Sequence, residues 1–318
     1  MKPLFLAITM ALPFLCFSQY TYDHVKVDFS TAGIYTYKNL RLYPVRAKES
    51  FKNQFRSVGT YLTLQEAIAK NKIKIAEKDE SGTVEELSME NISNDTIIIL
   101  PGEIIKGGKQ DRIIRKDVVL APHSGKKRLE VFCVESGRWS DREPVRKTSS
   151  AADFKSYHSK GAVSLRKVVE KESDQSKVWN EVENINKKNK TATRTKTYTA
   201  ITNSDNLNKE MAQYIKFFLG KLKAENDVIG VVVVTGGRVV GCDLFATHEL
   251  FAGQLESLLQ SYATEAILNG NVAVINTQTV KAYADKLFKS ESVQQATLKA
   301  KGSSFTHNGK KLRVSNFD

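Results

Sequence analysis

Short runs that alternate hydrophobic and polar residues fill much of the first half of the chain and predict strands. These runs are Leu40–Val45, Ile73–Ala76, Val84–Met89, Thr96–Leu100, Ile113–Ile114, Val118–Leu120 and Leu129–Val134. Turn-forming pairs separate them, at Ser81-Gly82, Asn94-Asp95, Gly107-Gly108 and Ser124-Gly125. The pattern predicts a mostly antiparallel β-meander. Ile97–Leu100 is apolar on both faces, so we expect it to be a central strand, and Thr63 with Glu66 forms a capping-box pattern for a helix over 62–70.

Helical periodicity dominates the second half of the chain. Apolar residues at Met211, Tyr214, Phe218 and Leu222 form one helical stripe. Two strand-like runs, 228–235 and 238–244, flank Gly236-Gly237, which is typical of a tight hairpin turn. Helices follow over about 247–268 and 277–289, and a short hairpin is expected around Asn308-Gly309. The predicted class is therefore α+β, with an N-terminal β-meander and a C-terminal helix–hairpin–helix layer.

The stretch over about 140–205 is polar and shows weak periodicity. We expect a mobile loop, one helix over about 173–188, and a further polar connection, which together form either a lid or a decorated surface excursion. The predicted organisation is a signal peptide (1–18), an N-terminal extension (19–37), an α+β domain (38–268) and a C-terminal helix with a short hairpin (269–318).

The N-terminus has the pattern of a secretory signal. Lys2 supplies a positive charge, an apolar stretch runs from Leu4 to Phe17, and small residues at Cys16 and Ser18 precede a cleavage point before Gln19. No later stretch reaches the roughly 18 apolar residues of a membrane span. We therefore expect export to the periplasm or the exterior, cleavage after Ser18, and a mature chain without a transmembrane segment.

The chain is basic, with a formal net charge of +13 and a sequence pI near 9.4. Removing residues 1–18 takes away one lysine and leaves +12. Such a surface attracts anions. Because an exported protein seldom meets nucleic acid, we expect a small anionic ligand as the partner and no nucleic acid, while a generally lysine-rich solvated surface is an equally good reading.

Two cysteines, Cys133 and Cys242, follow the predicted cleavage point. Export permits a disulfide, but both lie in apolar strand-like runs, so buried thiols are favoured. The chain has no Cys-x-x-Cys, and its five histidines are scattered, so no metal site is expected. The sequence identifies no cofactor and no oligomeric state.

Candidate site residues concentrate between positions 101 and 139. Glu103 follows a Pro-Gly corner after a buried strand, where desolvation favours acid/base use. Lys109, Gln110 and Arg112 follow Gly107-Gly108, and the free N–H groups of this turn can form an anion-binding nest closed by the guanidinium. The alternative is an ordinary hairpin with basic flanks, and Glu103 as a surface carboxylate.

The second half of this region ends in Cys133-Val134-Glu135-Ser136-Gly137-Arg138-Trp139. Cys133 and Glu135 project to the same face of a strand, which makes Glu135 a second candidate carboxylate. Cys133 has no histidine close in sequence, so a nucleophilic role is disfavoured. Arg138 on Trp139 serves either as a ligand platform or as structural stacking.

As a set, these motifs resemble the ARG and rhodanese-phosphatase-superfamily-associated protein domain. The likeness rests on Leu100–Glu103, Lys109–Arg112 and Cys133–Trp139, and extends to the segments Gln175–Trp179, Ile229–Val231, Asp243–Phe245 and Ser261–Ala266. It covers about residues 38–268. The family is named for gene neighbours that process ADP-ribose and phosphoesters, so the resemblance implies a nucleotide-derived ligand and no established activity.

Two classes of function compete on these residues, and the sequence does not choose between them. In the first, an enzyme acts on a small phosphorylated or glycosyl-nucleotide compound, with Glu103 and Glu135 as acid/base or metal-assisting carboxylates and Arg112 and Arg138 as anion clamps. In the second, a non-catalytic exported module binds an anion through the same arginines, and a structural envelope protein is a third reading. Since successive strands lie side by side, we expect Glu103, Gln110, Arg112, Glu135 and Arg138 to line one concave surface.

Overall fold

The computed structural model describes residues 20–31, 33–78, 85–137 and 154–318. The predicted signal peptide and its cleavage point after Ser18 lie outside these residues. So do Arg138 and Trp139, two of the candidate site residues.

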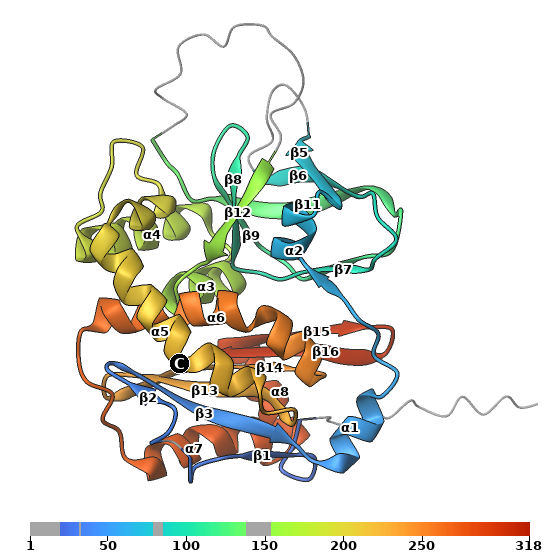
Figure 1. The fold of residues 1–318 in the computed structure, drawn as a ribbon, viewed down its shortest axis with the longest axis vertical. Helices are drawn as coiled ribbons and strands as arrows, with labels where there is room; N and C mark the ends of the chain where they lie inside the picture. The colour runs from blue at the N-terminus through green and yellow to red at the C-terminus, as the bar shows by residue number, and fades with distance from the viewer. Residues whose placement is uncertain (1–19, 32, 79–84, 138–153) are drawn as a thin grey trace, which may run out of the picture.

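The described chain folds into two lobes joined through one long helix (Figure 1). Its strands are β1 Val25–Val27, β2 Thr36–Tyr37, β3 Leu40–Ala47, β4 Leu62–Thr63, β5 Ile73–Glu77, β6 Glu86–Asn91, β7 Ile97–Ile99, β8 Glu103–Gly107, β9 Arg112–Ile114, β10 Val118–Leu120, β11 Gly125–Cys133, β12 Phe154–Lys160, β13 Val228–Thr235, β14 Arg238–Phe245, β15 Gly302–His307 and β16 Lys310–Phe317. Its helices are α1 Glu49–Phe55, α2 Leu64–Ala69, α3 Val163–Lys167, the π-helical turn η1 Val168–Glu172, α4 Gln175–Asn189, the 3₁₀ turn η2 Tyr198–Asn203, α5 Asp205–Lys223, α6 His248–Asn269, α7 Thr277–Phe288 and α8 Glu291–Lys301. This mixture of helices and antiparallel sheets confirms the α+β prediction.

One lobe is built on an antiparallel sheet with the strand order β1-β3-β13-β14-β16-β15, and β2 pairs with β3. We call it the central sheet. The predicted Gly236-Gly237 hairpin forms β13 and β14 at its centre, and the Asn308-Gly309 hairpin forms β15 and β16. Helices α5 and α6 cover one face and α7 lies on the other (Figure 1). Residues expected as an N-terminal extension and a C-terminal tail thus supply strands of the same sheet.

The other lobe, the β-lobe, is a curled half-barrel with the strand order β12-β8-β9-β11-β6-β5, beside the small sheet β10-β7-β4. Apart from the parallel β4–β7 pair, these strands pair antiparallel, which confirms the predicted antiparallel pairing, although the strand order is not sequential. β7 lies between β10 and β4, as its two apolar faces predict. The half-barrel interior is apolar, with Ile75, Ile105, Ile114 and Val131 in one buried cluster.

The polar stretch after residue 140 is folded wherever the structure describes it. Its predicted helix is present as α4. The expected loop, however, is wrong over 154–160, which forms the edge strand β12 of the half-barrel. The sequence of β12 is mostly polar: its end residues Phe154 and Lys160 are buried, whereas Lys155 and Ser156 are exposed. Helices α3 and α4 cover the outer face of β8, β9 and β11.

Helix α6 lies between the two lobes (Figure 1). Its apolar face, including Leu255, Leu258 and Leu259, packs into the core of the central sheet. Its opposite stripe carries Gln254, Ser257 and Ser261, which are also buried because the β-lobe covers them. A surface helix would expose such a polar stripe to water. Here the stripe helps to line a polar seam between the lobes.

Candidate functional site

The turn between β8 and β9 carries the Gly107-Gly108 motif. Gly108 has φ +54°, and a Cβ atom there would lie 2.4 Å from Phe154 Cζ and 2.7 Å from Glu77 Oε1. Only glycine fits this close approach. The glycine therefore lets the turn pack directly against the ends of β5 and β12.

Carboxylates of the protein itself occupy the N–H groups of this turn. Lys109 N donates to Glu77 Oε1 at 2.7 Å, and Gly107 N donates to Asp111 Oδ1 at 3.4 Å. Asp111 Oδ2 also accepts the hydroxyls of Thr197 and Thr199. The anion-binding nest expected from the sequence is thus used internally, by Glu77 and Asp111.

Arg112 is fully buried at the end of the half-barrel. Its Nη1 donates to Gln110 O at 3.0 Å, and its Nη2 lies 3.5 Å from Glu77 Oε1. Among the described residues, Arg112 Nε and Nη2 have no hydrogen-bond partner, and neither has Glu77 Oε2. Two unmet donors and one unmet acceptor therefore lie beside each other in a buried position, which native proteins seldom tolerate without a ligand or water.

Gln110 links the turn to the second motif. Its Oε1 accepts the Cys133 thiol at 3.0 Å, and its Nε2 donates to Glu135 O at 2.7 Å. The Glu135 carboxylate accepts Asp111 N at 3.2 Å. From the start of α4, Gln175 forms two hydrogen bonds of 2.8 Å with the Cys133 backbone. We call Glu77, Gln110, Asp111, Arg112, Cys133 and Glu135 the barrel-end cluster.

The thiol in this cluster is not an activated nucleophile. Burial raises the pKa of Cys133 to about 11, against the opposing effect of the Arg112 guanidinium. At neutral pH the side chain is therefore a thiol that donates to Gln110. Cys133 and Cys242 are both buried thiols, as their apolar surroundings predict.

Glu103 lies elsewhere, at the opposite end of β8. Ile105 pairs with Arg112, so Glu103 and Arg112 project to the same face of the sheet. Along the strand, Glu103 is nevertheless about 7 Å from the position opposite Arg112 and about 13 Å from the turn that begins after Gly107. Glu103 Oε2 accepts Leu100 N at 2.7 Å, and Glu103 pairs with Lys160 across β12. The structure thus brings Gln110, Arg112 and Glu135 together and keeps Glu103 apart from them.

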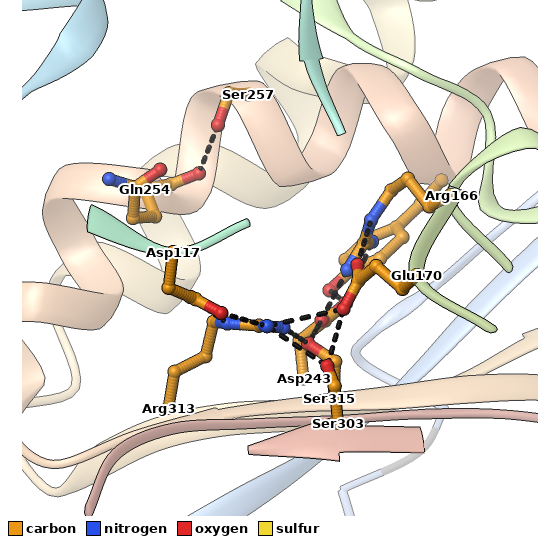
Figure 2. A network of polar contacts seen from close by, with 10 residues as sticks. Asp117, Arg166, Glu170, Asp243, Gln254, Ser257, Ser303, Arg313 and Ser315 are labelled. Carbon is orange, nitrogen blue, oxygen red and sulfur yellow. Dashed lines mark hydrogen bonds and ion pairs between the residues drawn. The ribbon is translucent and has the colours of Figure 1, made fainter. Parts of the chain in front are cut away.

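A second group of buried charges, the inter-lobe cluster, fills the seam between the lobes (Figure 2). Arg166 Nη1 donates to Asp243 Oδ2 at 3.0 Å, and this carboxylate also accepts the hydroxyls of Tyr262 and Ser315. Although burial opposes ionisation, the Arg166 guanidinium and these hydrogen bonds hold the pKa of Asp243 well below its usual range.

The same cluster joins the β-lobe to the central sheet. Arg313 of β16 makes a two-pronged ion pair with Asp117 of the β9–β10 connection, at 2.6 and 2.7 Å. Arg313 Nη2 also donates to Glu170 Oε2 of η1 at 3.1 Å. Figure 2 shows these groups meeting close to Asp243, Ser303 and Ser315, while Gln254 and Ser257 of α6 lie apart and are joined to each other.

Sequence reasoning missed most of the inter-lobe cluster. One signal was present, because Asp243 is a lone carboxylate between Cys242 and Leu244 in an otherwise apolar strand. A charge at such a position is buried and needs a partner. The partners Arg166 and Arg313 come from distant segments, and nothing local to them marks their role.

We also searched the described residues for a metal site, a membrane-spanning helix and a surface pocket. No group of three or more His, Cys, Asp or Glu in the described ranges is placed to hold a metal ion. None of the helices there is long and apolar enough to cross a membrane. A surface hollow of about 430 Å³ between β1 and α7 contains Lys26, Lys48 and Lys281 but none of the motif residues.

Comparison with known proteins places the chain in one family. The model of the ARG and Rhodanese-Phosphatase-superfamily-associated Protein domain matches residues 28–316, which covers both lobes and both clusters. No curated protein and no solved structure matches the chain. On this match over nearly the whole sequence, the chain belongs to the ARG and rhodanese-phosphatase-superfamily-associated protein domain family.

Proposed function

We propose that this chain binds a small anionic ligand that also carries hydroxyl groups, such as a sugar phosphate or a nucleotide-like molecule, at the barrel-end cluster. The observation that carries the proposal is the set of unmet buried atoms at Arg112 and Glu77. Arg112 Nε and Nη2 form one side of a guanidinium, the geometry that binds two oxygens of a phosphate or carboxylate. Glu77 Oε2 is an acceptor that suits a hydroxyl donor.

The energy of burial supports this reading. A buried polar group without a partner costs about 1–3 kcal/mol, and more when it is charged. A ligand that satisfies all three atoms recovers this cost on binding. We also keep Arg138 as a second anion clamp and Trp139 as a stacking platform, because they follow Glu135 closely in the chain.

We propose ligand binding at this site and do not propose that Glu103 and Glu135 act together as an acid/base pair. An acid/base pair must meet at one substrate. Glu135 belongs to the barrel-end cluster, and Glu103 contacts Leu100 and Lys160 at the other end of β8. This separation favours the binding module over the two-carboxylate enzyme.

A thermal-shift experiment tests the proposal directly. Purified protein is heated with inorganic phosphate, ribose 5-phosphate, AMP or ADP-ribose at matched ionic strength. We expect stabilisation by the ligands that combine phosphate with hydroxyls. Arg112→Lys keeps the positive charge but loses the two-nitrogen edge, so affinity should fall roughly thirty-fold or more, the effect of losing about 2–5 kcal/mol. Arg138→Ala should have the same effect.

Matched controls separate a defined site from diffuse attraction. Arg115→Lys makes the same chemical change three residues later, at a side chain that lies over the Phe132 ring. Lys126→Ala and Lys281→Ala remove exposed charges, on β11 and in the surface hollow. These three variants should bind like the wild type. Equal small losses in all variants, or no stabilisation by any of the ligands, would remove the proposed site.

Export of the protein is part of the proposal. It rests on Lys2, the apolar stretch from Leu4 to Phe17 and the small residues at Cys16 and Ser18. We expect N-terminal sequencing of fractionated cells to find a chain that begins at Gln19 outside the cytoplasm. A chain that keeps Met1 in the cytoplasmic fraction contradicts it.

A further inference from the structure

Lys160 is a further buried charged group, close to Arg166, Arg313 and Asp243 of the inter-lobe cluster. It ends β12, its side chain is 2% exposed, and its Nζ has no hydrogen-bond partner among the described residues. A buried ammonium normally has hydrogen-bond partners for its N–H groups. An amine that is buried without such a hydrogen bond destabilises the fold, so its position points to a role other than stability.

Two fixed cations stand near Lys160. Arg166 is held by Asp243, and its side chain packs on Gly102, where a Cβ atom would lie 2.7 Å from Arg166 Cγ. Arg313 is held by Asp117 and Glu170. Burial lowers the pKa of Lys160 to about 8, against the attraction of Glu103, and the positive charges of Arg166 and Arg313 lower it further. A neutral amine is therefore accessible near physiological pH.

A proton donor faces this amine across the strand pair. Glu103 is directly opposite Lys160 in the β8–β12 register. Burial raises the pKa of Glu103 to about 7, although Lys160 and the Leu100 N–H act against this. The carboxyl can thus exchange a proton near neutrality.

Further unmet donors surround the same seam. Arg166 Nε, Gln254 Nε2 and Ser261 Oγ are buried without hydrogen-bond partners in the described ranges. Tyr157 lies on β12 three residues before Lys160, next to Glu103 and Ser257. Together they match a guest rich in anionic or carbonyl oxygens.

We propose that Lys160 is a nucleophilic amine that forms an imine with a small 2-oxo acid in the seam between the lobes, with Glu103 as the proton donor and acceptor. The nitrogen lone pair attacks the carbonyl carbon and gives a carbinolamine. Glu103 protonates the hydroxyl, which leaves as water while the C=N bond forms, and the proton lost by nitrogen returns to Glu103. The carboxylate of the guest accepts hydrogen bonds from the unmet donors.

Reductive trapping tests this inference. The full chain is incubated at pH 8 with glyoxylate or pyruvate and sodium cyanoborohydride, which reduces an imine to a stable amine. Peptide mass spectrometry then locates the adducts. We expect Lys160 to be modified faster than exposed lysines such as Lys126, because its amine is neutral at a lower pH. Modification of Lys160 at or below the rate of Lys126 overturns the proposal, and this readout needs no variant.

Variants test the role of Glu103. Glu103→Gln keeps the shape and removes proton exchange, so trapping at Lys160 should slow by about 100-fold. Arg115→Lys, outside the seam, should leave the rate unchanged. An unchanged rate in Glu103→Gln would remove Glu103 from the mechanism. The readout is a covalent mark on Lys160, so it is independent of ligand binding at Arg112, and either proposal can fail alone.

Discussion

Asp243 organises the buried charges between the lobes. Its carboxylate accepts Arg166, Tyr262 and Ser315, and almost none of its surface reaches solvent. Asp243→Asn keeps the shape but leaves the Arg166 guanidinium without its counter-charge. Breaking a buried pair in this way costs about 3–5 kcal/mol. We therefore expect the variant to lose that much unfolding free energy in urea titrations.

Two further variants, one control and one double substitution, serve as references for this stability measurement. Asp23 is exposed, so Asp23→Asn should change stability by less than about 0.5 kcal/mol. The double variant Arg166→Met with Asp243→Leu replaces the ion pair by apolar groups and should be less destabilised than Asp243→Asn. A loss in Asp243→Asn as small as that of the control would mean that water already solvates the cluster.

Strand β12 contains a second titratable group, His158, on the segment that closes the half-barrel. Burial, with the nearby Lys106, lowers the pKa of His158 to about 4, against an ordinary value near 6.5. Between pH 6.5 and 4 the imidazole of His158 is therefore protonated in the unfolded chain and neutral in the folded chain. Stability therefore falls as pH drops from about 6.5 to 4.

Replacing this histidine should remove that contribution. We expect His158→Gln to lose less stability than the wild type between pH 7 and 5, measured by urea unfolding at each pH. His123 is exposed and has a left-handed backbone, φ +49°, which asparagine tolerates, so His123→Asn is the matched control. Identical pH profiles for His158→Gln and the wild type would contradict a half-buried imidazole that stays neutral.

Elements with strong local signals were predictable. The Gly236-Gly237 hairpin, the capped helix α2 and the long helix α6 appear where periodicity and turn residues place them. β12 was not predictable, because its residues Phe154–Lys160 are mainly polar and only the first and last of them are buried. A strand defined by its surroundings has no local pattern to read.

At the scale of the whole molecule, the barrel-end cluster was largely predictable from local motifs, whereas the inter-lobe cluster was not. Gln110, Arg112 and Glu135 come from motifs on adjacent strands, so the sequence predicts that they meet. Glu77 was missed because it arrives from β5, at the far edge of the half-barrel sheet. The inter-lobe cluster combines residues of β12, η1, β14 and β16. These segments meet only through long-range packing, so no local sequence motif predicts the cluster.

The strand order of the central sheet also determines when the protein can complete its fold. β3 pairs with β13, and β14 pairs with β16 at the very end of the chain. These contacts close long loops, so we expect the central sheet to form slowly and only after β16 has been synthesised. For a protein proposed to be exported, this delay keeps the chain unfolded during synthesis, in the form that a translocation channel can thread.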